Sequence, residues 1–277
     1  MSFVMEKYNE FERNLFGDEI IEFDIYDVDF WVDRISEFPK IRPLSLDKNS
    51  AFLTISKKYC ENPEFRLKLL KKYYFCPVLI FKLFKEGVYS IEDIKPIFQN
   101  DDSYIFCHYF KKEIGDFQNF IRKKPQPIIS QPIPENDEAI EQLINTGFLP
   151  SSIEYCLKYD DIQNLKKIDV SIDYVLKWSP FEWSYQPENK VMSDLLSFSA
   201  FFGSILCFKH LSSNNYKINS TTIESAICGG SLDIINMCFK NASDDCIYYA
   251  SYFYRESIVK FYLENGHDIN AQKQRFG

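Results

Sequence analysis

Glycine and histidine are both scarce in this chain, whose 277 residues include nine glycines and three histidines. So few glycines disfavour a fold with many tight turns. The histidines, at positions 108, 210 and 267, have no cysteine or carboxylate at a metal-binding spacing. The glycine-rich phosphate-binding, nucleophile-elbow and zinc-protease motifs are also missing. We therefore expect no catalytic residue, no metal site and no cofactor.

Cysteine pairs with a metal-binding or redox spacing are missing too, because none of the eight cysteines belongs to a Cys-x-x-Cys motif. Several of them stand among Ile, Phe and Leu at apolar positions of helical patterns. We expect reduced, buried thiols and a cytoplasmic or nuclear location. The cysteines are Cys60, Cys76, Cys107, Cys156, Cys207, Cys228, Cys238 and Cys246.

No apolar stretch approaches the ~20 residues that a membrane-spanning helix needs. The longest one, residues 78–84, is interrupted by Lys82. The first residues show neither the basic and apolar regions of a secretory signal nor a myristoylation glycine. We expect no secretion and no membrane partner.

Basic residues are outnumbered, since 32 Lys and Arg stand against 40 Asp and Glu, which gives a net charge of −8. Phosphate backbones repel an acidic chain, so we expect no nucleic-acid partner. A hydrophobic content of 45% makes the chain too apolar for general disorder. With few glycines and helical periodicity along most of its length, the chain is predicted to be all-α.

The first hundred residues contain several signals for the start or end of a helix. Asn62–Pro63 and Ser90–Asp93 mark helix starts, and Gly87 marks an end. Residues 18–38 are acidic and aromatic, and their first half alternates enough to leave a strand open as an alternative. We treat residues 1–100 as an N-terminal cap or a separate helical subdomain. The predicted helices are 2–15, most of 18–38, 50–60, 63–75, 78–85 and 90–98.

The remainder of the chain contains weaker copies of residues 255–271, in which an amphipathic helix ends at Gly266 and a polar turn follows. Each of the later copies follows a short helix that carries a small residue. A recurring helix–turn–helix unit is typical of a helical solenoid. The upstream copies are 230–235, 203–208, 160–165 and 115–120, and the small residues are Ala200, Ala226 and Ala250.

This unit resembles an ankyrin repeat, because Ile258–Val259 opens the helix and Gly266–His267–Asp268–Ile269–Asn270 follows it. The Thr-Pro-Leu-His signature of that family is missing, and Tyr254 replaces the glycine between the two helices. The copies are also irregularly spaced, whereas ankyrin repeats recur every ~33 residues. The chain is therefore most similar to the degenerate ankyrin-type domains of expanded protist protein families.

The resemblance implies a solenoid of degenerate ankyrin-like repeats over residues 101–277, with loop insertions at 123–137 and 178–190. Four prolines between positions 125 and 134 exclude a helix in the first insertion. It is either a surface loop or an extended proline-rich ligand. The second insertion is rich in aromatic residues, which either tuck onto the solenoid or act as binding anchors.

First helices and turn tips form the binding surface of such solenoids, so the resemblance also implies where a protein partner binds. The repeat frame places the candidate contact residues outside the packing stripe or on the second insertion. They are Trp178, Trp183, Tyr216, Lys217, His267 and Asp268.

The last helix, residues 257–264, carries apolar residues over an arc too wide for one packed face. We expect Ile258 and Leu263 to face the preceding helices and either Val259 or Tyr262 to be exposed. The chain would then self-associate through its C-terminal edge, or be the truncated form of a longer ankyrin protein.

We therefore expect a protein–protein interaction or scaffold module without catalysis. The alternatives are a hydrolase-like enzyme with an unrecognised site and a truncated product of a longer ankyrin-repeat gene. A stripe of exposed aromatic and charged residues across successive units would favour binding. One deep pocket with perturbed acids would favour an enzyme.

Overall fold

The computed structural model describes ten stretches of the chain, and each regular element in them is a helix, which confirms the all-α prediction. None of the described helices is both long and apolar enough to cross a membrane. The predicted helix at 2–15 and the turn after Glu264 lie outside the described residues. The described stretches are 28–41, 50–73, 76–126, 133–171, 173–177, 179–182, 192, 194–241, 245–253 and 255–264.

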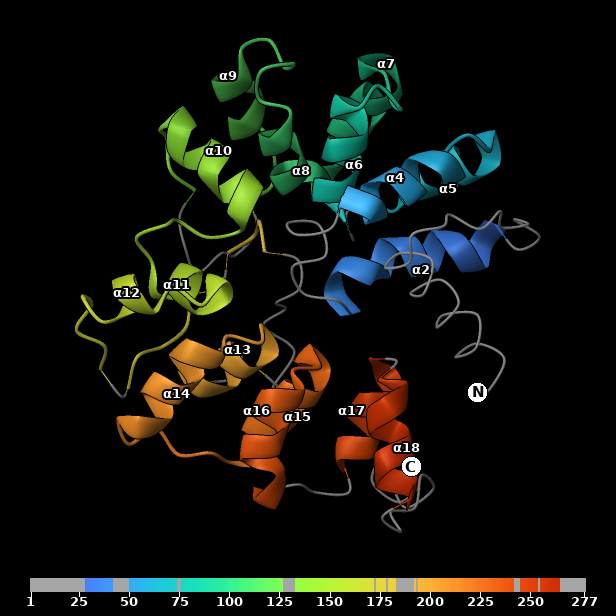
Figure 1. Ribbon diagram of the computed structural model, residues 1–277. Helices are drawn as coiled ribbons and strands as arrows, with labels where there is room; N and C mark the ends of the chain where they lie inside the picture. Colours follow the sequence, from blue (N-terminus) through green and yellow to red (C-terminus); the bar gives the residue numbers. More distant parts are fainter. Residues whose placement is uncertain are drawn as a thin grey trace.

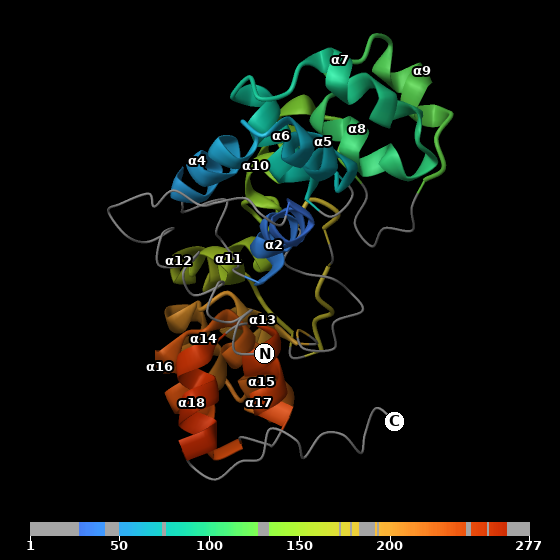
Figure 2. The ribbon, with the colours of Figure 1, turned by 90° about the vertical axis from the view of Figure 1, so that its right-hand side faces the viewer.

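The helices follow one another in chain order around an arc (Figure 1). In both ribbon views α4–α9 lie at one end and α13–α18 at the other, with α2 between them (Figure 2). Helix α2 (Val28–Ile41) contacts α5 (Pro63–Lys71), so the start of the described chain packs on the N-terminal helices.

The N-terminal helices begin and end largely where their caps predict. The Asn62 side chain accepts hydrogen bonds from the N–H groups of Glu64 and Phe65, and Ser90 forms a capping box with Asp93. Helix α5 ends at Lys71, four residues earlier than predicted. The remaining elements of this region are α4 (Ser50–Tyr59), α6 (Pro77–Lys85), α7 (Ile91–Ile94), η1 (Lys95–Gln99), η2 (Asp101–Ser103), α8 (Tyr104–Tyr109), α9 (Phe117–Arg122) and α10 (Asp137–Thr146).

The C-terminal helices form four stacked pairs. The first helices contact one another in the order α11, α13, α15, α17, and each also packs on the second helix of its own pair. Second helices contact each other from α12 through α14 to α16. The pairs are α11 (Ile153–Tyr159) with α12 (Ile162–Leu165), α13 (Leu195–Phe201) with α14 (Ile205–Ser213), α15 (Ser220–Gly229) with α16 (Leu232–Cys238), and α17 (Asp245–Tyr252) with α18 (Glu256–Glu264).

Small residues set the distance between successive first helices. Ala200, Ala226 and Ala250 are each completely buried. A Cβ atom at Gly229 would overlap with the carbonyl oxygen of Phe201, and would lie only 2.8 Å from that of Ala200. The backbones of α13 and α15 therefore approach each other so closely that no side chain fits between them.

Polar bonds from side chain to backbone also join neighbouring pairs. The Asp160 carboxylate accepts hydrogen bonds from the N–H groups of Leu206 (3.1 Å) and Cys207 (2.8 Å), in the first turn of α14. Asp160 itself ends α11 in the left-handed conformation, at φ +58°. The hydroxyl group of Ser204 donates to the carbonyl of Leu157 in the same preceding pair. The residue that ends α11 thus also caps the first turn of α14.

Arg255 forms the equivalent link between the last two pairs. Its guanidinium donates to the carbonyl groups of Cys228 (3.2 Å) and Gly229 (2.7 Å) at the end of α15. The cation therefore caps the negative end of a helix dipole. Gly230, at φ +81°, leaves the space for it, because a Cβ atom there would lie 2.5 Å from the guanidinium carbon.

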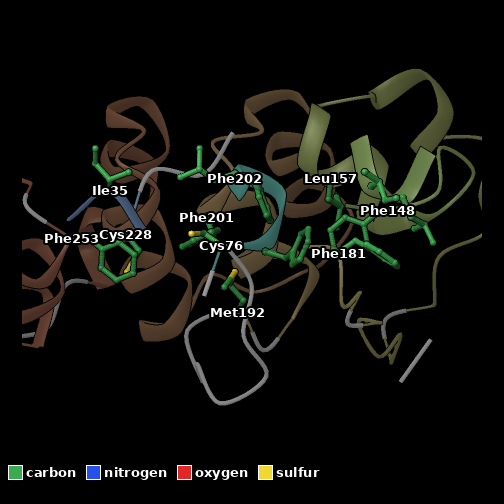
Figure 3. Close-up of a cluster of buried hydrophobic side chains, with 14 of the residues drawn as sticks. Ile35, Cys76, Phe148, Leu157, Phe181, Met192, Phe201, Phe202, Cys228 and Phe253 are labelled. Atoms are coloured by element: carbon green, nitrogen blue, oxygen red, sulfur yellow. The ribbon is translucent and has the colours of Figure 1, made fainter. Parts of the chain in front are cut away.

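Buried side chains form one continuous cluster from Trp31 to Tyr262. Figure 3 shows part of it, to which α2, α11, α13 and α15 each contribute side chains. All eight cysteines are buried in this cluster, so the prediction of buried cysteines is confirmed. The N-terminal helices and the four pairs therefore share one core.

Candidate functional site

Two of the six predicted partner contacts lie in the described part of the chain. Lys217 is exposed, in the connection between α14 and α15. Tyr216 beside it is half-buried against the core, and its hydroxyl group donates a hydrogen bond to the carbonyl of Ser171 at 3.1 Å. The Tyr216 side chain therefore contributes to the packing of the fold and is only partly available at the surface. Trp178, Trp183, His267 and Asp268 lie outside the described residues.

The described part of the second insertion is buried. Ser179, Phe181 and Glu182 are each less than a tenth exposed. Glu182 forms an ion pair with Lys158 of α11 at 2.8 Å, and both side chains are almost completely buried. Lys158 also donates to the carbonyl of Thr146 at 2.9 Å. This segment therefore packs onto the helices and locks α11 to the end of α10.

The packed face of α18 differs from the predicted one. Ile258 is buried as predicted, but Val259 and Tyr262 are buried as well, whereas Leu263 is 45% exposed. At 100° per residue, positions 258, 259 and 262 share a face that position 263 does not. The prediction that Leu263 packs inward and that Val259 or Tyr262 is exposed was therefore wrong. Phe261, 43% exposed, lies outside the packed face with Leu263.

Exposed aromatic side chains gather on the last two pairs. Tyr248 and Tyr252 of α17 are 45% and 60% exposed, and their rings stack at 6.2 Å with an angle of 21° between planes. On α18 the Phe261 ring lies 5.3 Å from that of Phe239, which is 38% exposed. This tyrosine pair was not predicted from the sequence, although its i, i+4 spacing places both rings on one helix face.

A cavity of about 430 Å³ lies at the other end of the molecule, between α6, α8 and α10. Apolar side chains form part of its wall, and the charged residues around it are paired. Lys85 pairs with Glu113 at 3.4 Å, Lys111 with Asp137, and Lys112 with Glu141 at 3.9 Å. The residues that line it are Phe81, Lys85, His108, Tyr109, Lys111, Lys112, Glu113, Asp137, Ile140, Glu141, Ile144 and Asn145.

His108 is the most unusual residue in this wall. It is only 6% exposed, and neither ring nitrogen has a hydrogen-bond partner in the described structure. Leaving a buried polar group without a partner costs about 1–3 kcal/mol. The rings of Tyr104 and Phe117 lie 5.1 and 5.2 Å from the imidazole, and that of Phe181 lies 6.4 Å away. The imidazole is therefore held among aromatic rings at the edge of the cavity.

Burial, together with the positive charge of Lys111, lowers the pKa of His108 from 6.5 to about 4. The imidazole is thus neutral at physiological pH, with one nitrogen as donor and the other as acceptor. In the sequence, position 108 has no cysteine or carboxylate at a metal-binding spacing, and nothing in its local pattern indicates the cavity.

The cysteine side chains are all buried. Burial raises the pKa of Cys60 to about 11 and that of Cys238 to about 12, so the thiolate form is suppressed. Among the described residues, no group of three or more His, Cys, Asp or Glu side chains is placed to hold a metal ion. The chemistry that the described surface offers is therefore recognition by exposed aromatic rings.

Comparison with known proteins adds one finding. Residues 214–275 match the family model of a domain of unknown function, DUF3447. The matched segment contains α15–α18 and includes both exposed tyrosines of α17. No curated protein and no solved structure matches the chain.

Proposed function

We propose that this chain is a protein-binding module, built as a solenoid of degenerate ankyrin-like repeats, and that it performs no catalysis. The stacked pairs α11–α18 support the solenoid, because first helix contacts first helix along the stack. Gly203 and Gly230 stand in the left-handed conformation in the turns between helices, where the repeat frame has its glycines.

The observation that carries the binding function is the stacked tyrosine pair of α17. A first helix of a solenoid faces the concave surface on which partners bind. Tyrosine is enriched among the residues that dominate interface energies, since a large ring is buried at a low entropic cost. Tyr248 and Tyr252 are two such rings on one face of a first helix, inside the segment that matches the family model.

The test compares two variants of the whole chain by affinity isolation from the source cell. A Tyr248→Ser/Tyr252→Ser double variant should lose tenfold or more of a partner that the unaltered chain recovers. Leu67→Ser is the matched control, because Leu67 is 56% exposed on α5, far from α17. Equal recovery by both variants, or cross-links to a partner only within residues 28–98, would contradict this binding surface.

We also propose self-association through the C-terminal edge, with the contact residues corrected by the structure. Phe261 and Leu263 are exposed on α18, and the exposed Phe239 lies in the short 3-10 helix η4 (Phe239–Asn241) that follows α16. A Phe261→Lys/Leu263→Lys variant should be more soluble and more monomeric in analytical ultracentrifugation, without unfolding. A concentration-independent monomer of the unaltered chain would remove this proposal.

A further inference from the structure

A short segment of the connection between α12 and α13 has one packed face and one exposed face. Tyr174 and Leu176 pack against the core. The side chains between and on either side of them are exposed, and they are Asp173, Val175 and Lys177. Alternation with a period of two is that of a β-strand, and this segment belongs to no helix. Val175 is 80% exposed, more than any other large apolar side chain in the described part of the chain.

The packed side of this segment is fixed to α11. Glu154 of that helix is itself buried, and its carboxylate accepts hydrogen bonds from the Tyr174 hydroxyl group (3.0 Å) and the Lys177 N–H group (2.7 Å). The Tyr174 N–H group donates to the carbonyl of Ser171 at 3.0 Å. The segment is therefore held in place before any partner binds, which lowers the entropic cost of binding.

The backbone of this segment keeps hydrogen-bonding groups available. Among the described residues, neither Val175 nor Leu176 forms a backbone hydrogen bond. Successive N–H groups of an extended chain point to opposite edges, so the Leu176 N–H group points away from the edge at which Glu154 holds that of Lys177. A row of unpaired N–H and C=O groups is a template to which a further strand adds.

The order of the exposed side chains fits a second copy of the same chain. When two copies pair antiparallel with Val175 opposite Val175, Asp173 of each copy lies opposite Lys177 of the other. In this register the Leu176 N–H group of each copy donates to the Tyr174 carbonyl of the other. A shift by two residues removes both ion pairs, so the charges specify the register.

We propose that two copies of this chain associate through residues 173–177, paired as antiparallel strands about a two-fold axis at Val175. Such an interface is isologous, because each copy contributes the same surface. A pairing of five residues is short, so the dimer is weak and forms at high protein concentration. It uses no residue of α17 or α18, and so does not rest on the function proposed above.

Charge reversal tests the register. Sedimentation equilibrium up to ~1 mM protein is measured in the Phe261→Lys/Leu263→Lys background, so that the C-terminal edge does not contribute. We expect this chain to dimerise, and Asp173→Lys or Lys177→Asp alone to weaken dimerisation about tenfold, because like charges then lie opposite each other. An equimolar mixture of the two variants restores both ion pairs and should form a heterodimer as readily as the background chain dimerises.

Three results would each overturn the proposal. They are a monomer at every concentration, unchanged dimerisation of either single variant, and no recovery in the mixture. The variants change exposed side chains, and circular dichroism checks that each one is folded.

Two further variants locate the interface. Val175→Lys brings two like charges together on the axis and should abolish the dimer. Leu206→Lys is the matched control, because Leu206 is 52% exposed on α14, and it should leave dimerisation unchanged. In ¹⁵N-labelled protein, the Leu176 amide signal should shift with concentration in the control and stay constant in Val175→Lys. Equal dimerisation of the two variants would refute this interface.

Discussion

Neighbouring helices are joined differently at the two ends of the molecule. Among the described residues of α2–α10, ion pairs between partly or fully exposed side chains link neighbouring elements, beside a few bonds to backbone such as that from the Tyr89 hydroxyl group to the Arg66 carbonyl (3.0 Å). In α11–α18, the links between pairs run from side chains such as Asp160 and Arg255 to backbone groups. The N-terminal ion pairs are Lys57–Glu86, Lys68–Asp29, Lys72–Asp33, Lys85–Glu113, Lys111–Asp137 and Lys112–Glu141.

This difference determines how much change each region tolerates. Exposed ion pairs contribute about 0–1 kcal/mol each, and long side chains adjust to a shifted helix. In the C-terminal pairs, by contrast, side chains bond to the backbone of the neighbouring pair, and there is no room for a Cβ atom at Gly229. The distance between α13 and α15 is therefore fixed. The C-terminal pairs should therefore be the less tolerant region.

The largest effect should come from the junction of the two regions. Lys158→Met leaves the buried Glu182 carboxylate without its cation, and should lower the free energy of unfolding by about 3–5 kcal/mol in guanidinium titrations. A Lys158→Met/Glu182→Met double variant removes both charges, and should recover much of that loss. A single variant that loses less than about 1 kcal/mol would show that this pair does not hold the junction.

A comparison of two glycines tests the difference in tolerance directly. Gly229→Ala forces a methyl group against the backbone of α13, and should cost about 3 kcal/mol. Gly115→Ala, in the N-terminal region, places its methyl group in open space and should change stability by less than about 0.5 kcal/mol. Similar losses for the two variants would contradict the contrast between the regions.

Acid should destabilise the N-terminal region through His108. Its pKa is about 4 in the folded chain and 6.5 when exposed, so below pH 6.5 the unfolded state binds the extra proton. Stability therefore falls as the pH drops from 6.5 towards 4. Between pH 7 and pH 5 the loss from this group is about 2 kcal/mol. Chemical denaturation of His108→Phe across this range should show a shallower pH dependence by that amount, and parallel curves would refute the assignment.

The smallest expected losses of stability compare a side-chain bond to the backbone with an ion pair on the surface. Asp160→Asn retains a residue that tolerates the left-handed conformation but halves the acceptor oxygens, and should cost about 1 kcal/mol. Lys112→Ala breaks an exposed pair at 3.9 Å, and should cost less than about 0.5 kcal/mol. Thermal or urea unfolding of both variants measures the difference, and a reversed order would contradict it.

The sequence predicted those features that local chemistry determines. Asn62 and Ser90 begin helices because a side chain satisfies the first N–H groups, and this information lies within four residues. The α18 face could not be predicted in the same way, because five apolar residues in seven leave its orientation to the neighbouring pair. Tyr248 and Tyr252 also resemble core residues, because they stand in a largely apolar helix. Which face of α17 packs against its neighbours decides that both are exposed.

The cavity depends on contacts that are distant in the sequence. The ring of Phe181, in the second insertion, lies 6.4 Å from that of His108, and Asp137, the last residue of the first insertion, pairs with Lys111, which precedes that insertion. Neither spacing matches a motif, so nothing in the local pattern separates this histidine from a packed one. Sites formed across insertions are visible only after the helices have been placed.

Asp160 has a consequence for the slow motions of the molecule. Because its carboxylate holds the N–H groups of Leu206 and Cys207, the first turn of α14 loses two acceptors when the end of α11 opens. Amide hydrogen exchange at these two positions therefore reports on the opening of the preceding pair as well as on that of α14. We therefore expect opening at the end of α11 to release the first turn of α14 as well, so that these two pairs exchange with solvent together.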